Sequence, residues 1–151
     1  MSLEQEVELI RRFPIFSKIA PAKQKLLCFS SDRLTYGAGQ VLFQEGAVGD
    51  ACYVVIDGLV EISVMRNEVR LLLNTLGSNE LIGEIAIFGQ VPRTATATAK
   101  TRVEVLRISK DLFHSVIREN PDAAIELIRI LAARLAHTTA VLANQSSAVG
   151  G

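Results

Sequence analysis

The middle of this chain has the apolar patterns of short strands, whereas both ends follow a helical period. Strand-like patterns run through four segments, residues 54–56, 60–65, 69–73 and 103–108. Tight turns are predicted at Asp57-Gly58 and Asn67-Glu68. Eight of the ten glycines lie between Gly37 and Gly89, as expected for short strands joined by turns. The pattern indicates a sandwich or barrel rather than a parallel sheet.

Helical patterns flank this region. Residues 3–13 have a weakly amphipathic pattern that ends before Pro14, and Pro21 stands where a second short helix could begin. After the last strand pattern, Ser109 is suited to cap the N-terminus of a further helix. We therefore expect two short helices before the strands and at least one directly after them.

The C-terminal part is predicted to be one long helix. No glycine occurs between the Asn120-Pro121-Asp122 break and about residue 144, and the apolar residues form a stripe broader than a strict heptad: Ile125, Ile128, Leu131, Leu135 and Leu142. Such a stripe can face both the barrel and a second subunit. We expect a single domain over residues 1–145, with a β-roll at about 31–108, C-terminal helices at about 109–144 and a disordered tail at 146–151.

The composition narrows the classes of function. Sixteen basic and sixteen acidic residues give a net charge of zero, which argues against a surface that follows a phosphate backbone. No apolar run approaches the ~20 residues that span a bilayer, and the N-terminus is unlike a signal peptide, so we expect a cytoplasmic protein. Cys28 and Cys52 form no CxxC pair, and His114 and His137 are isolated, so we predict no metal site.

The candidate chemistry lies in residues 81–99, LIGEIAIFGQVPRTATATA. Gly83 and Glu84 open a short apolar helical run. The first amides of that run, at about Glu84, Ile85 and Ala86, could point at an anion, because the start of a helix has unpaired N–H groups and a positive dipole end. Gly83 would let the backbone approach the anion closely.

Further along the same segment, Pro92 leads directly into Arg93 and Thr94. Arg93 can bind phosphate oxygens with two parallel hydrogen bonds, and Thr94 can add a hydroxyl donor. Glu84 cannot favourably face a phosphate, so we expect it to accept a hydrogen bond from a sugar hydroxyl. The Thr-Ala alternation that follows is typical of a strand.

Residues Leu81 to Ala99 resemble the phosphate-binding cassette of cyclic nucleotide-binding domains, which occur in catabolite gene activators, kinase regulatory subunits and cyclic-nucleotide-gated channels. A second block matches too: Phe43 to Asp50, followed by Tyr53 and the Asp57-Gly58 turn. The resemblance covers about residues 8–145. It implies a mainly β fold with flanking α-helices: a double-stranded β-helix (jelly-roll-like β-barrel) with N-terminal helices, a short cassette helix and a long C-terminal helix.

The resemblance also assigns residues to the ligand. Around the ribose and cyclic phosphate it places Gly83, Glu84, Arg93 and Thr94. In catabolite activators, two adjacent hydroxyl residues of the long helix, one from each subunit, contact adenine, and Thr138 and Thr139 fall at that place. Cyclic AMP is therefore the first expected ligand, in a homodimer joined through the long helix. A Thr beside the phosphate Arg helps to hold guanine in some members, so Thr94 keeps cyclic GMP as an alternative.

The expected function is that of a cyclic nucleotide-binding regulatory module that transmits binding through movement of its C-terminal helix. The alternatives are a truncated transcription regulator whose DNA-binding part is missing, and a ligand-free dimerisation domain. We expect no DNA binding from this chain alone, because residues 145–151, QSSAVGG, cannot form a recognition helix. We expect no enzyme and no cofactor, because neither a metal cluster nor a base–nucleophile pair accompanies the loop.

Overall fold

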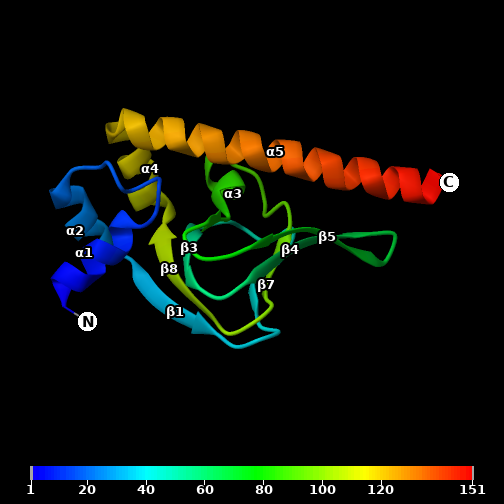
Figure 1. Ribbon diagram of the computed structural model, residues 1–151, viewed down its shortest axis with the longest axis horizontal. Coiled ribbons are helices and arrows are strands. Elements are labelled where there is room, and N and C mark those ends of the chain that lie inside the picture. Colours follow the sequence, from blue (N-terminus) through cyan, green and yellow to red (C-terminus); the bar gives the residue numbers. More distant parts are fainter. Residues whose placement is uncertain (1, 151) are drawn as a thin grey trace.

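Two four-stranded antiparallel sheets form the middle of the molecule (Figure 1). The computed structural model describes residues 2–150, and for residues 145–150 it describes the backbone alone. In the first sheet the strand order is β1 (Asp32–Tyr36), β8 (Val103–Ser109), β3 (Ala51–Asp57) and β6 (Leu81–Ile82). In the second it is β2 (Val41–Phe43), β7 (Thr96–Ala99), β4 (Val60–Arg66) and β5 (Val69–Leu76). This is the arrangement of a jelly roll, so the predicted mainly β fold is confirmed.

Small and β-branched residues fill the inside of the roll. The predicted Thr-Ala strand is β7, whose Ala97 and Ala99 are buried, while the alternating Thr96 and Thr98 are only partly covered. These alanines meet Val60 of β4 in one buried cluster. Successive side chains of a strand point to opposite faces, so the alternation in sequence becomes an inner and an outer face.

The predicted turns have the backbone that tight hairpins require. Asn67 and Glu68 have φ angles of 53° and 66°, and two successive positive values are typical of a type I′ turn between antiparallel strands. Gly58 has a φ of 95°, and a Cβ there would lie 2.2 Å from the carbonyl oxygen of Arg102. Glycine is therefore required at this turn.

Three helices gather at one end of the roll around a second core: α1 (Leu3–Arg11), α2 (Pro21–Ser30) and α4 (Lys110–Glu119). Phe16 packs edge-on against Phe113 of α4, with ring centroids 6.2 Å apart. The predicted N-terminal helices are present, although the first ends at Arg11 rather than at residue 13. Ser109 caps α4 as predicted, since its hydroxyl accepts a hydrogen bond from the amide of Leu112 at 3.3 Å.

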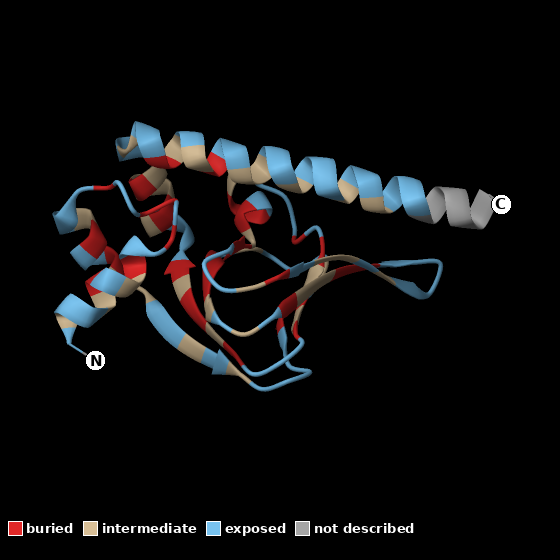
Figure 2. Cartoon of the chain, viewed as in Figure 1, coloured by how far each residue is buried: buried red, intermediate tan, exposed pale blue. Residues whose placement is uncertain are grey.

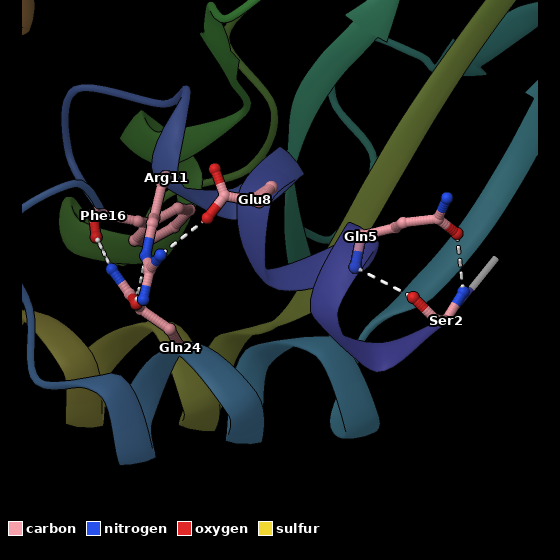
Figure 3. Close-up of polar contacts among 6 residues, drawn as sticks. All are labelled: Ser2, Gln5, Glu8, Arg11, Phe16 and Gln24. Carbon is pink, nitrogen blue, oxygen red and sulfur yellow. Dashed lines mark hydrogen bonds and ion pairs between the residues drawn. The ribbon is translucent and has the colours of Figure 1, made fainter.

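Polar contacts fix the N-terminal helices (Figure 3). The side chain of Gln24 is buried, donates to the carbonyl oxygen of Phe16 at 3.1 Å, and accepts from Nε of Arg11 at 3.1 Å. At the start of α1, the Ser2 hydroxyl accepts from the amide of Gln5, and the Gln5 side chain accepts in return from the amide of Ser2. Such a reciprocal capping box satisfies two donors that the helix leaves unpaired.

The long helix α5 (Pro121–Gly150) lies along the roll as a single rod. Its residues Ala123 and Leu127 are buried, whereas Ile128 and Leu135 are exposed and Leu142 is partly exposed. Figure 2 shows that exposed residues recur along the whole described length of the helix. The backbone of α5 continues past the predicted end near residue 144, because no glycine or proline interrupts it before Gly150. Of the predicted disordered tail, the side chains of residues 146–150 and the whole of residue 151 lie outside the described residues. Within residues 2–150, no helix combines the length and apolar character needed to cross a membrane.

Candidate ligand-binding site

A short helix, α3 (Glu84–Phe88), follows directly after β6, as the sequence predicted. Its N-cap residue, Gly83, has a φ of 85°, a left-handed conformation that residues with a Cβ rarely adopt. A Cβ at Gly83 would lie only 2.6 Å from Nη1 of Arg93. Glycine at this position therefore serves both the backbone turn and the close approach of the arginine.

The Arg93 side chain is buried against the start of α3, with 4% of its surface exposed. Its Nη1 donates to the carbonyl oxygen of Gly83 at 2.8 Å, and its Nη2 donates to that of Ala51 at 2.6 Å. The guanidinium carbon lies 4.2 Å from the centre of the Phe43 ring, which favours a cation. Burial lowers the pKa of Arg93, but a guanidinium remains charged in proteins.

Arg93 forms no ion pair with a carboxylate among the described residues, although the charge of Asp50 acts on it from further away. It takes part in none of their ion pairs, and its buried Nε has no hydrogen-bond partner there. A buried charge is costly unless it is paired. The site therefore holds a positive charge and a free donor where an anion would be stabilised.

The loop after β2 fixes the backbone of Arg93. The amide of Gly46 donates to the carbonyl oxygen of Arg93 at 2.8 Å, and the amide of Arg93 donates to that of Ala47 at 2.8 Å. In the same loop, a Cβ at Gly49 would lie 2.5 Å from the Cβ of Ala86 on α3. These contacts explain why the second sequence block, Phe43 to Asp50, accompanies the first, because its loop supports the arginine and the cassette helix.

Glu84 meets a residue that the sequence analysis missed. Only 3% of Glu84 is exposed, and its Oε1 accepts a hydrogen bond from Nη1 of Arg134 at 2.8 Å. Arg134 belongs to α5, where it lies four residues before Thr138 and hence on the same face of the helix. The four-residue spacing from Thr138 could therefore have indicated from the sequence that Arg134 faces the same site. The ion pair links the cassette helix directly to the long helix.

These groups open into a cavity of about 360 Å³ between the roll, α3 and α5. Seven of the eight predicted ligand-binding residues line it: Gly83, Glu84, Ile85, Ala86, Arg93, Thr94 and Thr138. Thr139 does not line the cavity and lies on the exposed side of α5. The remaining lining was not predicted: Phe43, Ile62, Val64, Arg66, Leu73, Asn74, Leu76, Ile82, Ala95, Arg134 and Leu142.

The cavity has two chemically different ends. At one end, the start of α3 and the Arg93 guanidinium supply N–H donors and positive charge. At the other, β4, β5 and α5 supply mostly apolar residues together with Asn74, Thr138 and two arginines, Arg66 and Arg134. The residues that the structure describes contain no cluster of three or more His, Cys, Asp or Glu side chains that could hold a metal ion. The arrangement suits a ligand with an anionic end and a flat, mostly apolar end.

The fold and the cavity are those of a ligand-binding domain: a jelly roll with a buried arginine at the start of a short internal helix. The chain belongs to the cyclic nucleotide-binding domain family, whose model matches residues 33–120. The family is regulatory and not catalytic. The resemblance drawn from the cassette sequence is thereby confirmed.

Individual relatives agree with this assignment. The chain is 33% identical over 138 residues to a CRP-like cAMP-activated global transcriptional regulator of Mycobacterium tuberculosis, a match that covers 91% of this chain and 62% of that protein. The catabolite activator protein of Thermus thermophilus has a similar structure, with a TM-score of 0.73 and 30% identity over 88% of this chain and 63% of that one. The chain thus spans less than two thirds of the length of both.

The same kind of domain is also found within proteins of a different overall activity. A lysophospholipase of Neurospora crassa is 26% identical over 136 residues, which are 84% of this chain but only 9% of that protein. The match therefore concerns a small part of the lysophospholipase.

Proposed function

We propose that this domain binds cyclic AMP, with the cyclic phosphate at the start of α3 and against Arg93. The observation that carries the proposal is the buried guanidinium, which forms no ion pair with a carboxylate and whose Nε has no hydrogen-bond partner among the described residues. A phosphate placed there would supply the missing counter-charge and accept bonds from both the arginine and the first amides of α3. Thr94 lines the same end of the cavity and can add its hydroxyl.

We assign the ribose to Glu84. This buried carboxylate lies one residue beyond Gly83, beside the proposed phosphate position, and it can accept a hydrogen bond from a sugar hydroxyl. In the structure its Oε1 is occupied by Arg134. A bound ribose hydroxyl must therefore share the Glu84 carboxylate with Arg134 or replace Arg134 as its partner.

We assign the base to the opposite end of the cavity, beside Thr138. A hydroxyl can accept a hydrogen bond from the exocyclic amine of adenine, and the apolar wall of β4 and β5 suits the faces of a purine. The name of the Mycobacterium tuberculosis relative supports cyclic AMP as the ligand. Cyclic GMP is the second candidate, on account of Thr94.

The signal would pass through α5. Two polar contacts hold the middle of this helix to the roll: the Arg134–Glu84 ion pair, and His137, whose Nε2 lies 3.1 Å from the carbonyl oxygen of Leu73. A ligand that changes the bonding of Glu84 binds the arrangements of α5 with different affinities. That difference is the requirement for a shift in population between them.

We further propose that two copies pair through α5. Ile128, Leu135 and Leu142 recur every seven residues and are exposed by 64%, 69% and 45%. An apolar repeat of this spacing is typical of a helix that packs against a second helix. Thr139 lies near this face and, in the pair, would approach the site of the partner. We assign no DNA binding to this domain itself, whose sequence has no excess of positive charge.

Calorimetric titration of the purified chain with cyclic AMP and cyclic GMP tests the proposal. Arg93→Ala should reduce the binding free energy by about 2–5 kcal/mol, as removal of one partner of a buried charge pair does. Arg118→Ala is the matched control, because Arg118 is exposed on α4 and does not line the cavity. Equal affinity of the two variants would refute the site. Absence of any binding by the unmodified chain would favour a ligand-free dimerisation domain.

A further inference from the structure

Asn74 lies in the cavity because β5 is irregular beside it. In the pairing of β4 with β5, Ile62 faces Asn74, but the next residue, Ser63, faces Leu72. Leu73 is therefore an extra residue, a β-bulge. Neighbouring side chains of a regular strand point to opposite faces, yet Leu73 and Asn74 both line the cavity. Asn74 also borders a second cavity, of about 390 Å³, on the side of His137. Bulges commonly redirect a side chain next to a functional site.

The same bulge joins β5 to the long helix. The Leu73 carbonyl oxygen lies 3.1 Å from Nε2 of His137. Asn74 follows Leu73 on β5, and Thr138 follows His137 on α5. Both Asn74 and Thr138 line the cavity. The amide and the hydroxyl are thereby brought to one end of the cavity from elements that are distant in sequence.

The Asn74 side chain is oriented and retains unused donors. Its Oδ1 accepts a hydrogen bond from the amide of Thr75 at 2.8 Å, which directs its Nδ2 away from that amide. Within the described part of the chain, Nδ2 donates to no residue. Its surroundings in the cavity wall are mostly apolar, including Ile62, Leu73 and Leu76. A donor in such a wall gains from a ligand atom that accepts a hydrogen bond.

We propose that Asn74 is a specificity-determining residue that donates a hydrogen bond from Nδ2 to a ring nitrogen of the adenine. This inference rests on the proposed function. In adenine the N6 amine is flanked by the acceptors N1 and N7. Thr138 accepts from N6 while Asn74 donates to one of these neighbours. Thr138 and Asn74 together recognise a hydrogen-bond donor next to an acceptor on adenine. Guanine has the acceptor O6 in place of the N6 amine, so it does not match this pair.

The test compares ligands that lack one ring nitrogen. Calorimetry measures cyclic AMP and its 1-deaza and 7-deaza analogues against the unmodified chain, Asn74→Ala and Thr75→Ala. Thr75 is exposed on the same strand and does not line the cavity, so Thr75→Ala is the matched control. Thermal unfolding of each variant establishes that it is folded.

In the unmodified chain and in Thr75→Ala, one deaza analogue should bind about fivefold more weakly than cyclic AMP, the weight of one neutral hydrogen bond. In Asn74→Ala that difference should vanish, because cyclic AMP itself then binds as weakly as the analogue. The other analogue should behave like cyclic AMP throughout.

Two results would overturn the inference while leaving the proposed function intact. One is that both analogues bind the unmodified chain as tightly as cyclic AMP does. The other is that Asn74→Ala weakens all three ligands by the same factor, as a structural role would. If cyclic AMP does not bind the unmodified chain at all, both the proposed function and this inference fail.

Discussion

The two ends of the cavity are built in different ways. The phosphate end comes mainly from residues 83–94, where Glu84 and Arg93 are buried and Arg93 is hydrogen-bonded to two backbone carbonyl oxygens. The base end is assembled from β4, β5 and α5, and its polar residues Asn74 and Thr138 are only partly covered. The first end can therefore supply affinity, whereas the second can supply selectivity and respond to the position of α5.

One contact joins the two ends. Glu84 belongs to the phosphate end, and its partner Arg134 belongs to the helix that forms the base end. Both residues of this ion pair line the cavity. Substitutions at each end of the cavity, and at the ion pair between Glu84 and Arg134, are therefore expected to change different measured properties.

A large loss of binding, within the range expected for Arg93→Ala, is expected from Gly83→Ala, which disturbs the phosphate end. The new Cβ would approach Nη1 of Arg93 to 2.6 Å in a backbone with a φ of 85°, so the guanidinium must move. Cyclic AMP should bind about 100-fold more weakly, as when a buried charge pair is disrupted. Gly39→Ala is the control, because Gly39 has a φ of 88° with nothing near its missing Cβ. Equal affinities of the two variants in calorimetry would contradict the account.

A second variant alters α5 without touching the phosphate end. Leu135→Glu places a carboxylate in the proposed seam between two copies and should weaken self-association by about 2 kcal/mol, or roughly thirtyfold. Analytical ultracentrifugation measures this change. Ala140→Glu is the control, since Ala140 is exposed and lies about 140° around the helix from Leu135. If both variants associate like the unmodified chain, the apolar face is not the seam.

Much of the fold and the phosphate end could be predicted from sequence, because both depend on local patterns. The turns, the Thr-Ala strand and the glycine before α3 are each determined by neighbouring residues. The short strands β1, β2 and β6 gave no separate signal, since their identity depends on pairing with distant strands. Arg134 and Asn74 were missed for a similar reason, because an ion pair between helices and a bulge at Leu73 arise only in the folded chain.

Thr138 and Thr139, which are adjacent in sequence, also show what a sequence pattern cannot predict. The resemblance assigned them to the adenine, one from each subunit, and only Thr138 lines the cavity of this chain. Thr139 lies on the exposed side of α5, so its role depends on a second copy and stays a prediction. A pattern of residue types cannot by itself say which side of a helix faces which chain.

A moderate loss of folding stability is expected when the ion pair between Glu84 and Arg134 is removed. Arg134→Ala leaves the buried Glu84 without the ion-pair partner that it has in the structure, and should lower the free energy of unfolding of the empty domain by about 1–2 kcal/mol. The lower part of the usual range applies because the Arg134 side chain is 18% exposed. Arg129→Ala on the exposed side of the same helix should change this free energy by less than about 0.5 kcal/mol. Urea unfolding that gives the same value for both would contradict the proposed link.

The smallest effects are expected at the two threonines. Thr138→Ala should weaken cyclic AMP by about 1 kcal/mol, the weight of one hydrogen bond, and should weaken cyclic GMP less. Thr139→Ala should act only where two copies are paired, so its effect should disappear in the Leu135→Glu background. Competition with a fluorescent cyclic nucleotide measures both. An effect of Thr139→Ala that persists in the separated chain would place this residue in its own cavity.

The phosphate end is assigned affinity and the base end selectivity. The most direct test of these roles is a calorimetric series in which the unmodified chain is titrated with cyclic AMP, cyclic GMP and adenosine. Adenosine keeps the base and ribose but lacks the phosphate. The account predicts that cyclic AMP binds about tenfold more tightly than cyclic GMP, and at least about 100-fold more tightly than adenosine, a difference of about 2.7 kcal/mol. Adenosine binding within a few-fold of cyclic AMP would contradict the assignment of the phosphate to Gly83 and Arg93.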